Sequence, residues 1–503
     1  MFRRYFLLLL SIALLFAFSK RTVAFAGNAD VPRFEAVPCP VAFQAQYTVQ
    51  CGFLIVPAEH AKPDGATIKV AVAIFKSRSL HPQPDPVIYL SGGPGSRTLD
   101  SFAGGLGSYL ETARGNRDII LVDQRGIGYS EPSLACPEVD ELLLRDEQGP
   151  GSANVPLQRK AIQQCYERLI DQHVDLATFN TVESAADIAA LGPVLGYPQV
   201  NIDGGSYGST LAMTVMRHHS DVIRSVVLQG VTPPEVDLMS SFGPDFERAL
   251  NLVFAACQAD SACNTAYPDL STTFYAALKQ LTDKPLTLQL THPVTGRALT
   301  FHADAVDFIG AVQWAMYSSS SISQLPMFIT AVYNKNIKIL EPLALTTLTI
   351  TKTSTLGANL AMRCMDDVMT TTPEAWSAAV DTLQPSLQPA FRSGTTGVDW
   401  WTDTCAMGWD ARQLDPIENT PVKSDLPTLM MNGKFDPVTP PMWAAAALPY
   451  LSRGINLDFP ESAHGVNPTP CAMKILNDFI NEPTTQPDTQ CIAKLKSISF
   501  VMP

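Results

Sequence analysis

The sequence predicts an α/β fold in which a mostly parallel central sheet carries an inserted, helix-rich cap domain. In the first half of the chain, short apolar segments typical of strands alternate with segments whose apolar residues have helical spacing. From about residue 235 to residue 421 this alternation stops, and two strand-like segments follow it near the C-terminus. With 503 residues, of which 46% are hydrophobic, the chain is long enough to form a core and an insertion.

The individual elements follow from apolar runs bounded by turn residues. The expected strands are, in chain order, 52–56, 68–75, 86–90, 119–122, 200–202, 222–228, 426–431 and 455–459. Thr181–Leu195 has helical spacing and ends at Gly196, so it is expected to be the crossover helix before the strand at 200–202. Residues 27–234 and 422–503 are therefore assigned to the two parts of the core, and 235–421 to the cap.

Five tryptophans fall in the cap segment, and their large apolar area favours positions in its hydrophobic core. They are Trp314, Trp376, Trp400, Trp401 and Trp409.

The N-terminus is typical of an export signal. Two arginines precede the apolar stretch Tyr5–Phe18, and Ala24–Ala26 has the small-x-small pattern of a cleavage site. We expect residues 1–26 to be removed and the mature chain to be periplasmic or extracellular. A membrane anchor is the alternative, but the apolar stretch is shorter than the roughly 20 residues that span a bilayer, so no stable membrane insertion is expected after the signal is removed.

Charge and cysteine content narrow the possible partners. Loss of the four basic residues in 1–26 changes the formal net charge from −13 to −17, which disfavours binding to nucleic acid.

All ten cysteines lie beyond the signal, and an even number in an exported chain indicates disulfides. There is no C-x-x-C pair and no H-E-x-x-H helix, so neither a metal nor another cofactor is expected.

The segment Gly204–Gly208 has the G-x-S-x-G spacing of a nucleophile elbow. It follows an expected strand and precedes the helix-like segment 209–219. A serine at such a turn adopts strained backbone geometry, and small neighbours are needed where strand and helix approach. Ser206 is therefore the candidate nucleophile, although the five-residue pattern also occurs in plain glycine-rich turns.

A nucleophilic serine needs a histidine base and a carboxylate that orients the histidine. Five histidines follow Ser206 in the chain, and His464 is distinguished because it lies in a loop directly after the last expected strand. Asp436 lies in the loop after the preceding strand, where parallel sheets carry functional groups. The order Ser206, Asp436, His464 is that of an α/β-hydrolase triad.

The remaining candidates are donors for the oxyanion. Gly92–Gly95 follows the expected strand 86–90, and glycines allow the backbone to approach a reacting carbonyl closely. We assign the oxyanion hole to the N–H groups of Gly93 and Tyr207, the residue after the nucleophile. Taken alone, Gly92–Gly95 is more typical of a plain turn.

These motifs, together with Asp123–Ser130, Asp436–Pro440 and Ala463–Gly465, resemble secreted α/β-hydrolases of the tripeptidyl aminopeptidase and prolyl iminopeptidase type. The resemblance covers most of the mature chain and implies an α/β-hydrolase fold and a serine peptidase that acts near a free N-terminus. Within Asp123–Ser130, Arg125 is expected to be structural and to tie its loop to neighbouring carbonyls.

The resemblance also implies an acid in the cap that holds the substrate ammonium group. The candidates are Asp366 and Asp367, or Asp245 and Glu247. A carboxylesterase or lipase that uses the same triad on an ester remains the alternative, and a catalytically silent binding protein is a remote one.

Sequence alone leaves many cysteine pairings open, and the resemblance implies that neighbours pair in order. The implied pairs are Cys39–Cys51, Cys136–Cys165, Cys257–Cys263, Cys364–Cys405 and Cys471–Cys491.

Overall fold

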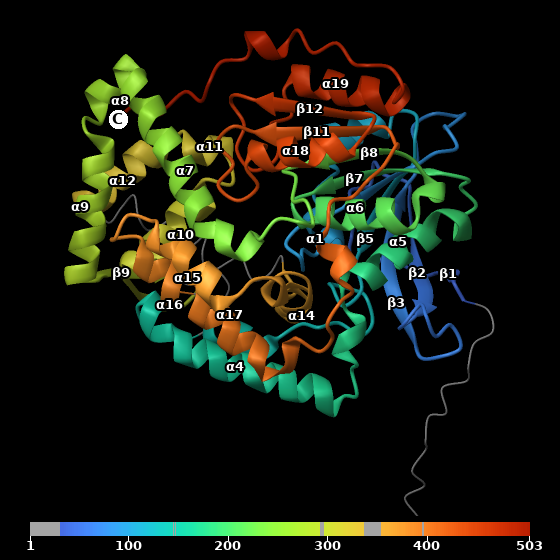
Figure 1. Cartoon of the computed structure of the whole chain (residues 1–503), viewed down its shortest axis with the longest axis horizontal. Helices are drawn as coiled ribbons and strands as arrows, with labels where there is room; N and C mark the ends of the chain where they lie inside the picture. The colour runs from blue at the N-terminus through green and yellow to red at the C-terminus, as the bar shows by residue number, and fades with distance from the viewer. Residues whose placement is uncertain (1–30, 144, 146, 292–295, 337–353, 395–396) are drawn as a thin grey trace, which may run out of the picture.

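The computed structural model describes residues 31–503 except 144, 146, 292–295, 337–353 and 395–396 (Figure 1). The export signal expected at 1–26 lies outside the described residues.

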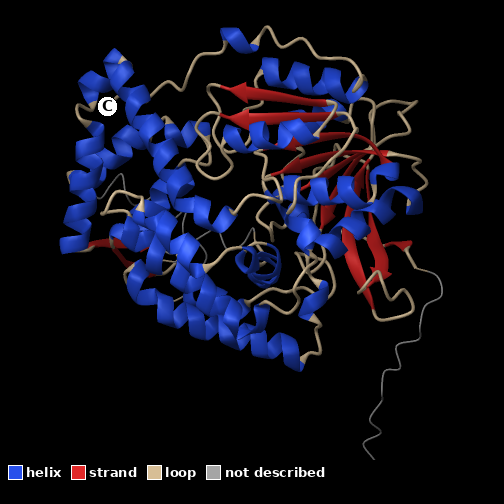
Figure 2. Ribbon diagram, in the orientation of Figure 1, coloured by secondary structure: helices blue, strands red, loops and turns tan. Residues whose placement is uncertain are grey.

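A nine-stranded sheet forms the core of the described chain (Figure 2). The order across the sheet is β1 (Arg33–Ala36), β2 (Val49–Pro57), β3 (Thr67–Phe75), β5 (Ile119–Asp123), β4 (Val87–Leu90), β7 (Val200–Gly205), β8 (Ile223–Gln229), β11 (Thr428–Gly433) and β12 (Gly454–Phe459). Neighbours from β5 to β12 are parallel, whereas β1, β2, β3 and β5 pair antiparallel. All eight expected strands are present, and the edge strand β1 is an addition.

Both faces of the sheet are buried, which is why its strands read as continuous apolar runs. In β3, Val70, Val72 and Ile74 belong to one hydrophobic cluster, and the alternate residues Ala71, Ala73 and Phe75 belong to the other. The helices α5 (Thr181–Val194), α6 (Tyr207–His218) and α18 (Pro441–Ala447) contribute to the first cluster. The second cluster contains residues of α2 (Gly107–Ala113) and α19 (Pro470–Asn481).

The cap lies beside the ends of β11 and β12, toward which the arrowheads of these strands point (Figure 1). Its helices are α7 (Leu238–Ala259), α8 (Ser261–Ala266), α9 (Leu270–Asp283), α10 (Ala305–Ala315), α11 (Ser319–Ile322), α12 (Leu325–Tyr333), α14 (Leu356–Asp366), α15 (Pro373–Asp381), α16 (Gln388–Ser393) and α17 (Val398–Thr404). The segment also contains an antiparallel pair, β9 (Leu286–Thr291) and β10 (Ala298–Ala303), which sequence patterning did not indicate.

The cap extends beyond the expected boundary of 235–421. The helix α4 (Gly151–Asp171), expected within the first part of the core, runs beneath α16 and α17 (Figure 1). Arg159 of α4 pairs with Asp403 of α17 at 2.7 Å, and β6 (Glu147–Gln148) joins β10. The sequence pattern of an amphipathic helix shows that one face is buried, but it does not show which layer buries it.

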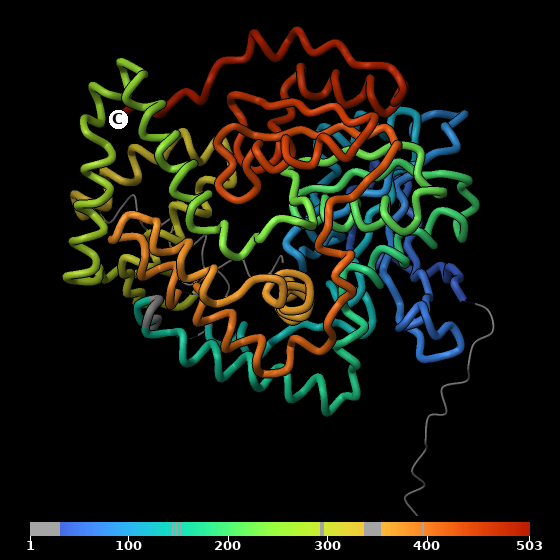
Figure 3. The backbone as a smooth tube through the Cα atoms, in the orientation of Figure 1, coloured from blue at the N-terminus to red at the C-terminus, as the bar shows by residue number. Residues whose placement is uncertain are grey.

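The C-terminal segment links the two parts of the molecule. After α19 the chain passes over the sheet and ends against the cap (Figure 3). There Val501 donates its backbone N–H to Ser323 and accepts a hydrogen bond from the hydroxyl of Tyr267, both at 2.9 Å.

The five disulfides join the cysteine pairs that the resemblance implies. Four of the five cap tryptophans are buried as expected, but Trp314 on α10 is 49% exposed. No helix in the described part of the chain has the length and apolar content that crossing a membrane requires.

Candidate active site

Ser206 lies at a sharp turn between β7 and α6. Its φ of 56° and ψ of −128° are unusual for a residue with a side chain. A Cβ atom on Gly208 would collide with the carbonyl of Leu90, and one on Gly204 would collide with the carbonyl of Gly208. The two glycines therefore let the strand and the helix approach closely enough to present the serine at the turn.

Asp436 and His464 come from the loops after β11 and β12 and contact each other directly. Asp436 is fully buried, and its Oδ2 lies 2.9 Å from Nδ1 of His464. The same carboxylate accepts hydrogen bonds from the backbone N–H groups of Val438 and Thr439 and from the Thr439 hydroxyl, at 2.9, 2.8 and 2.6 Å. Because Oδ2 of Asp436 faces Nδ1 of His464, the imidazole directs its Nδ1–H toward Asp436 and its Nε2 away from it.

The turn after β8 brings the serine and the histidine to the same place. The backbone N–H of Ser206 donates to the carbonyl of Gln229 at 2.9 Å. The next residue, Gly230, has a φ of +56°, and a Cβ there would lie 3.3 Å from Cε1 of His464 and 2.7 Å from the Thr439 hydroxyl. Ser206 and His464 therefore both lie beside the turn Gln229–Gly230, and Asp436 is joined to His464, so the three residues lie at the carboxyl ends of β7, β12 and β11.

The glycine loop after β4 lies against the serine. A Cβ on Gly92 would lie 2.7 Å from Cβ of Ser206 and 3.2 Å from its hydroxyl oxygen. Gly93 has a φ of +110°, a conformation that side chains rarely adopt. Tyr207 is the first residue of α6, and the first N–H groups of a helix have no partner within the helix. The arrangement can provide the two expected oxyanion donors, Gly93 and Tyr207.

The cap helix α14 holds this glycine loop through one of its faces. Thr355 donates its N–H to the carbonyl of Gly95 at 2.8 Å, the Asn359 amide donates to Pro94 at 2.8 Å, and Arg363 donates to Gly93 at 2.6 Å. Residues four apart lie on one face of a helix, which accounts for the repeated contact. Nothing in the sequence motifs indicated these contacts, because the two segments lie about 260 residues apart.

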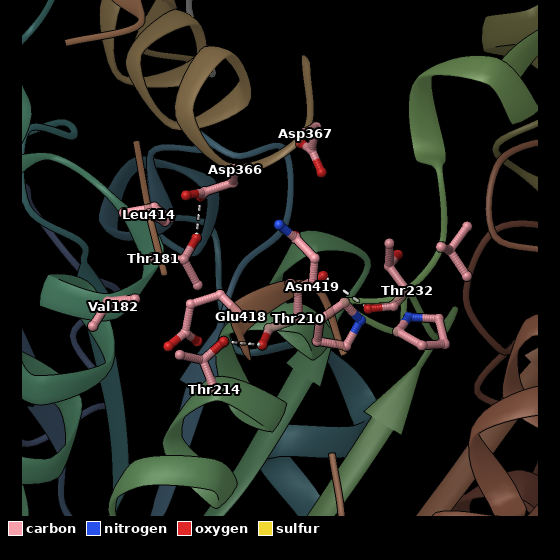
Figure 4. A pocket seen from close by; sticks show the side chains of 13 residues that line it. Thr181, Val182, Thr210, Thr214, Thr232, Asp366, Asp367, Leu414, Glu418 and Asn419 are labelled. Atoms are coloured by element: carbon pink, nitrogen blue, oxygen red, sulfur yellow. Dashed lines mark hydrogen bonds between the residues drawn. The ribbon is translucent and has the colours of Figure 1, made fainter. Parts of the chain in front are cut away.

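Asp366 and Asp367, at the end of α14, line a pocket next to the elbow (Figure 4). The hydroxyl of Thr181 donates to Oδ2 of Asp366 and lies 2.7 Å from the Tyr207 hydroxyl. Oδ1 of Asp366 is buried and has no hydrogen-bond partner among the described residues. Burial raises the pKa of Asp366 to about 8, whereas Asp367 pairs with Arg363 at 2.6 Å.

The other two candidate acids lie on α7 and have different surroundings. Asp245 is buried near Arg248, and burial raises its pKa to about 7. The Arg248 guanidinium donates to the backbone carbonyl of Asp436. Glu247 accepts a hydrogen bond from the backbone N–H of Gln384 at 3.2 Å and is not among the residues that line the pocket of Asp366.

One aromatic side chain that sequence patterning did not link to the site, Tyr317, lies beside the histidine. The rings of Tyr317 and His464 have centroids 4.8 Å apart in an edge-to-face arrangement. Among the described residues, no group of three or more His, Cys, Asp or Glu side chains has the proximity needed to hold a metal ion.

Comparison with known proteins identifies the family. Residues 85–464 match the family model of the alpha/beta hydrolase fold. The chain belongs to the alpha/beta hydrolase fold family. Within this group, Tripeptidyl aminopeptidase of Streptomyces coelicolor is 29% identical to the chain over 211 residues, which are 40% of this chain and 38% of that protein.

Two further relatives differ in their names. Serine protease Hip1 of Mycobacterium tuberculosis is 23% identical over 83% of this chain and 81% of that protein. Carboxylesterase B of the same organism is 26% identical over 47% of this chain and 48% of that protein. The match thus spans less than two fifths of the tripeptidyl aminopeptidase but most of Hip1.

Proposed function

We propose that this alpha/beta hydrolase is an exported serine hydrolase that cleaves peptide bonds near a free N-terminus. The observation that carries the proposal is the hydrogen bond between the buried Asp436 and His464, near the strained turn of Ser206. Relatives named tripeptidyl aminopeptidase and serine protease support peptidase chemistry. The five disulfides support export, since such bonds persist in oxidising compartments.

In the proposed mechanism, the hydroxyl oxygen of Ser206 attacks the scissile carbonyl while Nε2 of His464 takes its proton. The N–H groups of Gly93 and Tyr207 stabilise the oxyanion as charge develops. His464 then returns the proton to the leaving amine, and a water molecule hydrolyses the acyl-enzyme by the same steps. Asp436 holds the imidazole in the required tautomer and stabilises the imidazolium.

The same proposal assigns the substrate ammonium group to the pocket of Asp366 and Asp367. Thr210, which lines this pocket, lies four residues after the nucleophile. Thr181 also lines the pocket, and its hydroxyl lies 2.7 Å from that of Tyr207. A bound ammonium group supplies the missing partner of Asp366 Oδ1 and favours the ionised carboxylate. Glu247 is the weaker candidate because its carboxylate already accepts a hydrogen bond from Gln384.

A carboxylesterase that uses the same three residues is the second candidate, supported by the relative named Carboxylesterase B. The two functions differ in the leaving group and in whether a free N-terminus is required. A binding protein on this fold, the remote alternative, would not react with a fluorophosphonate that labels activated serines.

The test compares p-nitroanilide peptides that have free or acetylated N-termini with p-nitrophenyl esters, using Ser206→Ala as the blank. We expect cleavage of free peptides over acetylated ones, and loss of nearly all turnover in Ser206→Ala. Asp366→Asn is expected to raise KM for free peptides about tenfold, the effect of losing roughly 1.4 kcal/mol of binding. Glu247→Gln is the matched control and is expected to leave KM unchanged.

Each other outcome has a distinct meaning. Ester cleavage alone would favour the carboxylesterase, and full activity of Ser206→Ala would refute the proposed nucleophile. An unchanged preference for free N-termini in Asp366→Asn would remove that acid from the ammonium site.

N-terminal sequencing of the secreted protein checks the export signal, for which a mature chain beginning at residue 27 is the expected result.

A further inference from the structure

We infer that Trp314 and Tyr317 form the binding site for the leaving-group side of the substrate and that this site prefers an apolar or aromatic side chain. The inference rests on the proposed function, because it assigns a role to residues beside the proposed catalytic histidine. It adds a specificity for the residue that follows the cleaved bond.

Tyr317 lies beside the proposed catalytic histidine. This residue follows α10, and its ring meets that of His464 at an angle of 67° and a centroid distance of 4.8 Å. The hydroxyl of Ser319 accepts a hydrogen bond of 3.0 Å from the backbone N–H of Ala463, the residue before His464. The segment that carries Tyr317 is therefore attached to the loop that carries the histidine.

Trp314 is exposed and packs against Tyr317. Its ring lies 4.9 Å from that of Tyr317 with an angle of 30° between the planes, and 49% of the residue is exposed. The other four cap tryptophans are 8% exposed or less. The indole therefore continues an aromatic surface from the histidine outward and has area available for another ring.

The orientation of His464 sets the direction of proton transfer. Nδ1 of His464 faces Asp436, so the proton passes through Nε2. The leaving atom must come within about 3 Å of Nε2 to receive the proton. The substrate residue attached to that atom therefore lies beside the side chains that contact the histidine ring. Tyr317 contacts this ring and Trp314 packs against Tyr317, whereas the acidic pocket is lined by Thr181 and Thr210. The acyl side of the substrate would thus contact acidic side chains, and the leaving-group side would contact aromatic ones.

The test uses capture of the acyl-enzyme by an added amine. Departure of the leaving amine and attack by an incoming amine are the same step in opposite directions, so both use one site. The amine nitrogen attacks the acyl carbonyl, the ester bond to Ser206 breaks, and the amine proton passes through His464 to the serine oxygen. Phenylalanine amide and glycine amide are compared as acceptors, and the ratio of captured to hydrolysed product is measured by chromatography.

We expect phenylalanine amide to be captured about tenfold better than glycine amide, the usual scale for an added aromatic contact. Trp314→Ala is expected to reduce this preference at least threefold, and Trp314→Phe is expected to retain it. Tyr450→Ala is the matched control: Tyr450 is 39% exposed and precedes β12, so it lies at the opposite end of that strand from His464. Thermal unfolding of each variant shows whether it is folded.

Failure of the inference is distinguishable from failure of the proposed function. The acyl-enzyme can be formed from an ester or from a peptide anilide, so capture reports on this site in a peptidase and in an esterase. An unchanged preference in folded Trp314→Ala, or a preference for glycine amide in the wild type, would overturn the inference alone. Absence of any acyl-enzyme would overturn both.

Discussion

Asp366 shows how one buried side chain links stability to pH. Its carboxylate has a single hydroxyl partner, Thr181, and a buried second oxygen without one among the described residues. Burial raises its pKa from an ordinary value of 3.8 to about 8. Between these two values the folded protein binds more protons than the unfolded chain, so this group lowers the free energy of unfolding as the pH rises. Its stabilising contribution is fully present below pH 3.8 and is lost as the pH passes through about 8.

We therefore predict that Asp366→Asn raises the melting temperature relative to the wild type at about pH 8 and does not raise it at about pH 4. The asparagine keeps an acceptor for Thr181 but removes the buried charge. Scanning calorimetry across this range measures the difference, with Glu247→Gln as the control that replaces a carboxyl group outside the pocket of Asp366. Parallel melting curves for Asp366→Asn and the wild type would show that the carboxyl group does not titrate as described.

At the scale of elements, α14 connects the cap to the glycine loop of the core. Arg363 donates to the carbonyl of Gly93 and also pairs with Asp367, so it joins the proposed oxyanion loop to the acidic pocket. Gly93 has a φ of +110°, and charge-assisted hydrogen bonds such as that of Arg363 are among the stronger ones in proteins. Arg363 is thus a positioning residue for the loop.

We predict that Arg363→Met lowers kcat by about tenfold to a hundredfold toward an ester substrate, because a small displacement of an oxyanion donor is costly. KM for the ester is expected to change little, since the ester lacks the ammonium group that Asp366 and Asp367 are proposed to bind. Arg392→Met is the matched control: Arg392 belongs to the cap helix α16 and pairs with Asp381. A change in KM alone would indicate that Arg363 acts on binding and not on the loop.

At the scale of the whole molecule, the C-terminal segment contacts the cap, and a disulfide within the cap fixes the helix that reaches the core. Cys364 of α14 is bonded to Cys405 across 41 residues, and the residue before it is Arg363. Both cysteines are buried, so this bond ties the helix that positions the glycine loop to the segment after α17. Stability and activity should therefore depend on the same bond.

We predict that replacing Cys364 and Cys405 by alanine lowers the free energy of unfolding by about 4 kcal/mol, as expected for a loop of this length, and also lowers kcat. The control replaces Cys39 and Cys51, which close a loop of 12 residues at β2. That pair is expected to contribute about 3 kcal/mol and to leave kcat unchanged. Denaturant unfolding and ester turnover measure the two effects, and an unchanged kcat without Cys364–Cys405 would show that α14 holds its position independently.

The sequence by itself predicted the eight strands, the crossover helix and the order of Ser206, Asp436 and His464. These features depend on local properties: the period of apolar residues, the glycines that a tight turn requires and the position of a residue just after a strand. Arg125 is a further example, since it donates to the carbonyls of Ala58 and Thr178 as expected. The sequence did not reveal that it also pairs with buried Asp187.

Only the tertiary structure decided which cap residues reach the site. The contacts of Arg363 with Gly93, of Tyr317 with His464 and of α4 with the cap each join segments that are distant in the chain. The exposure of Trp314 likewise depends on which face of α10 the rest of the cap covers. A local pattern shows that a residue is apolar or charged, but its partner is set by how helices pack, and that packing depends on the whole chain.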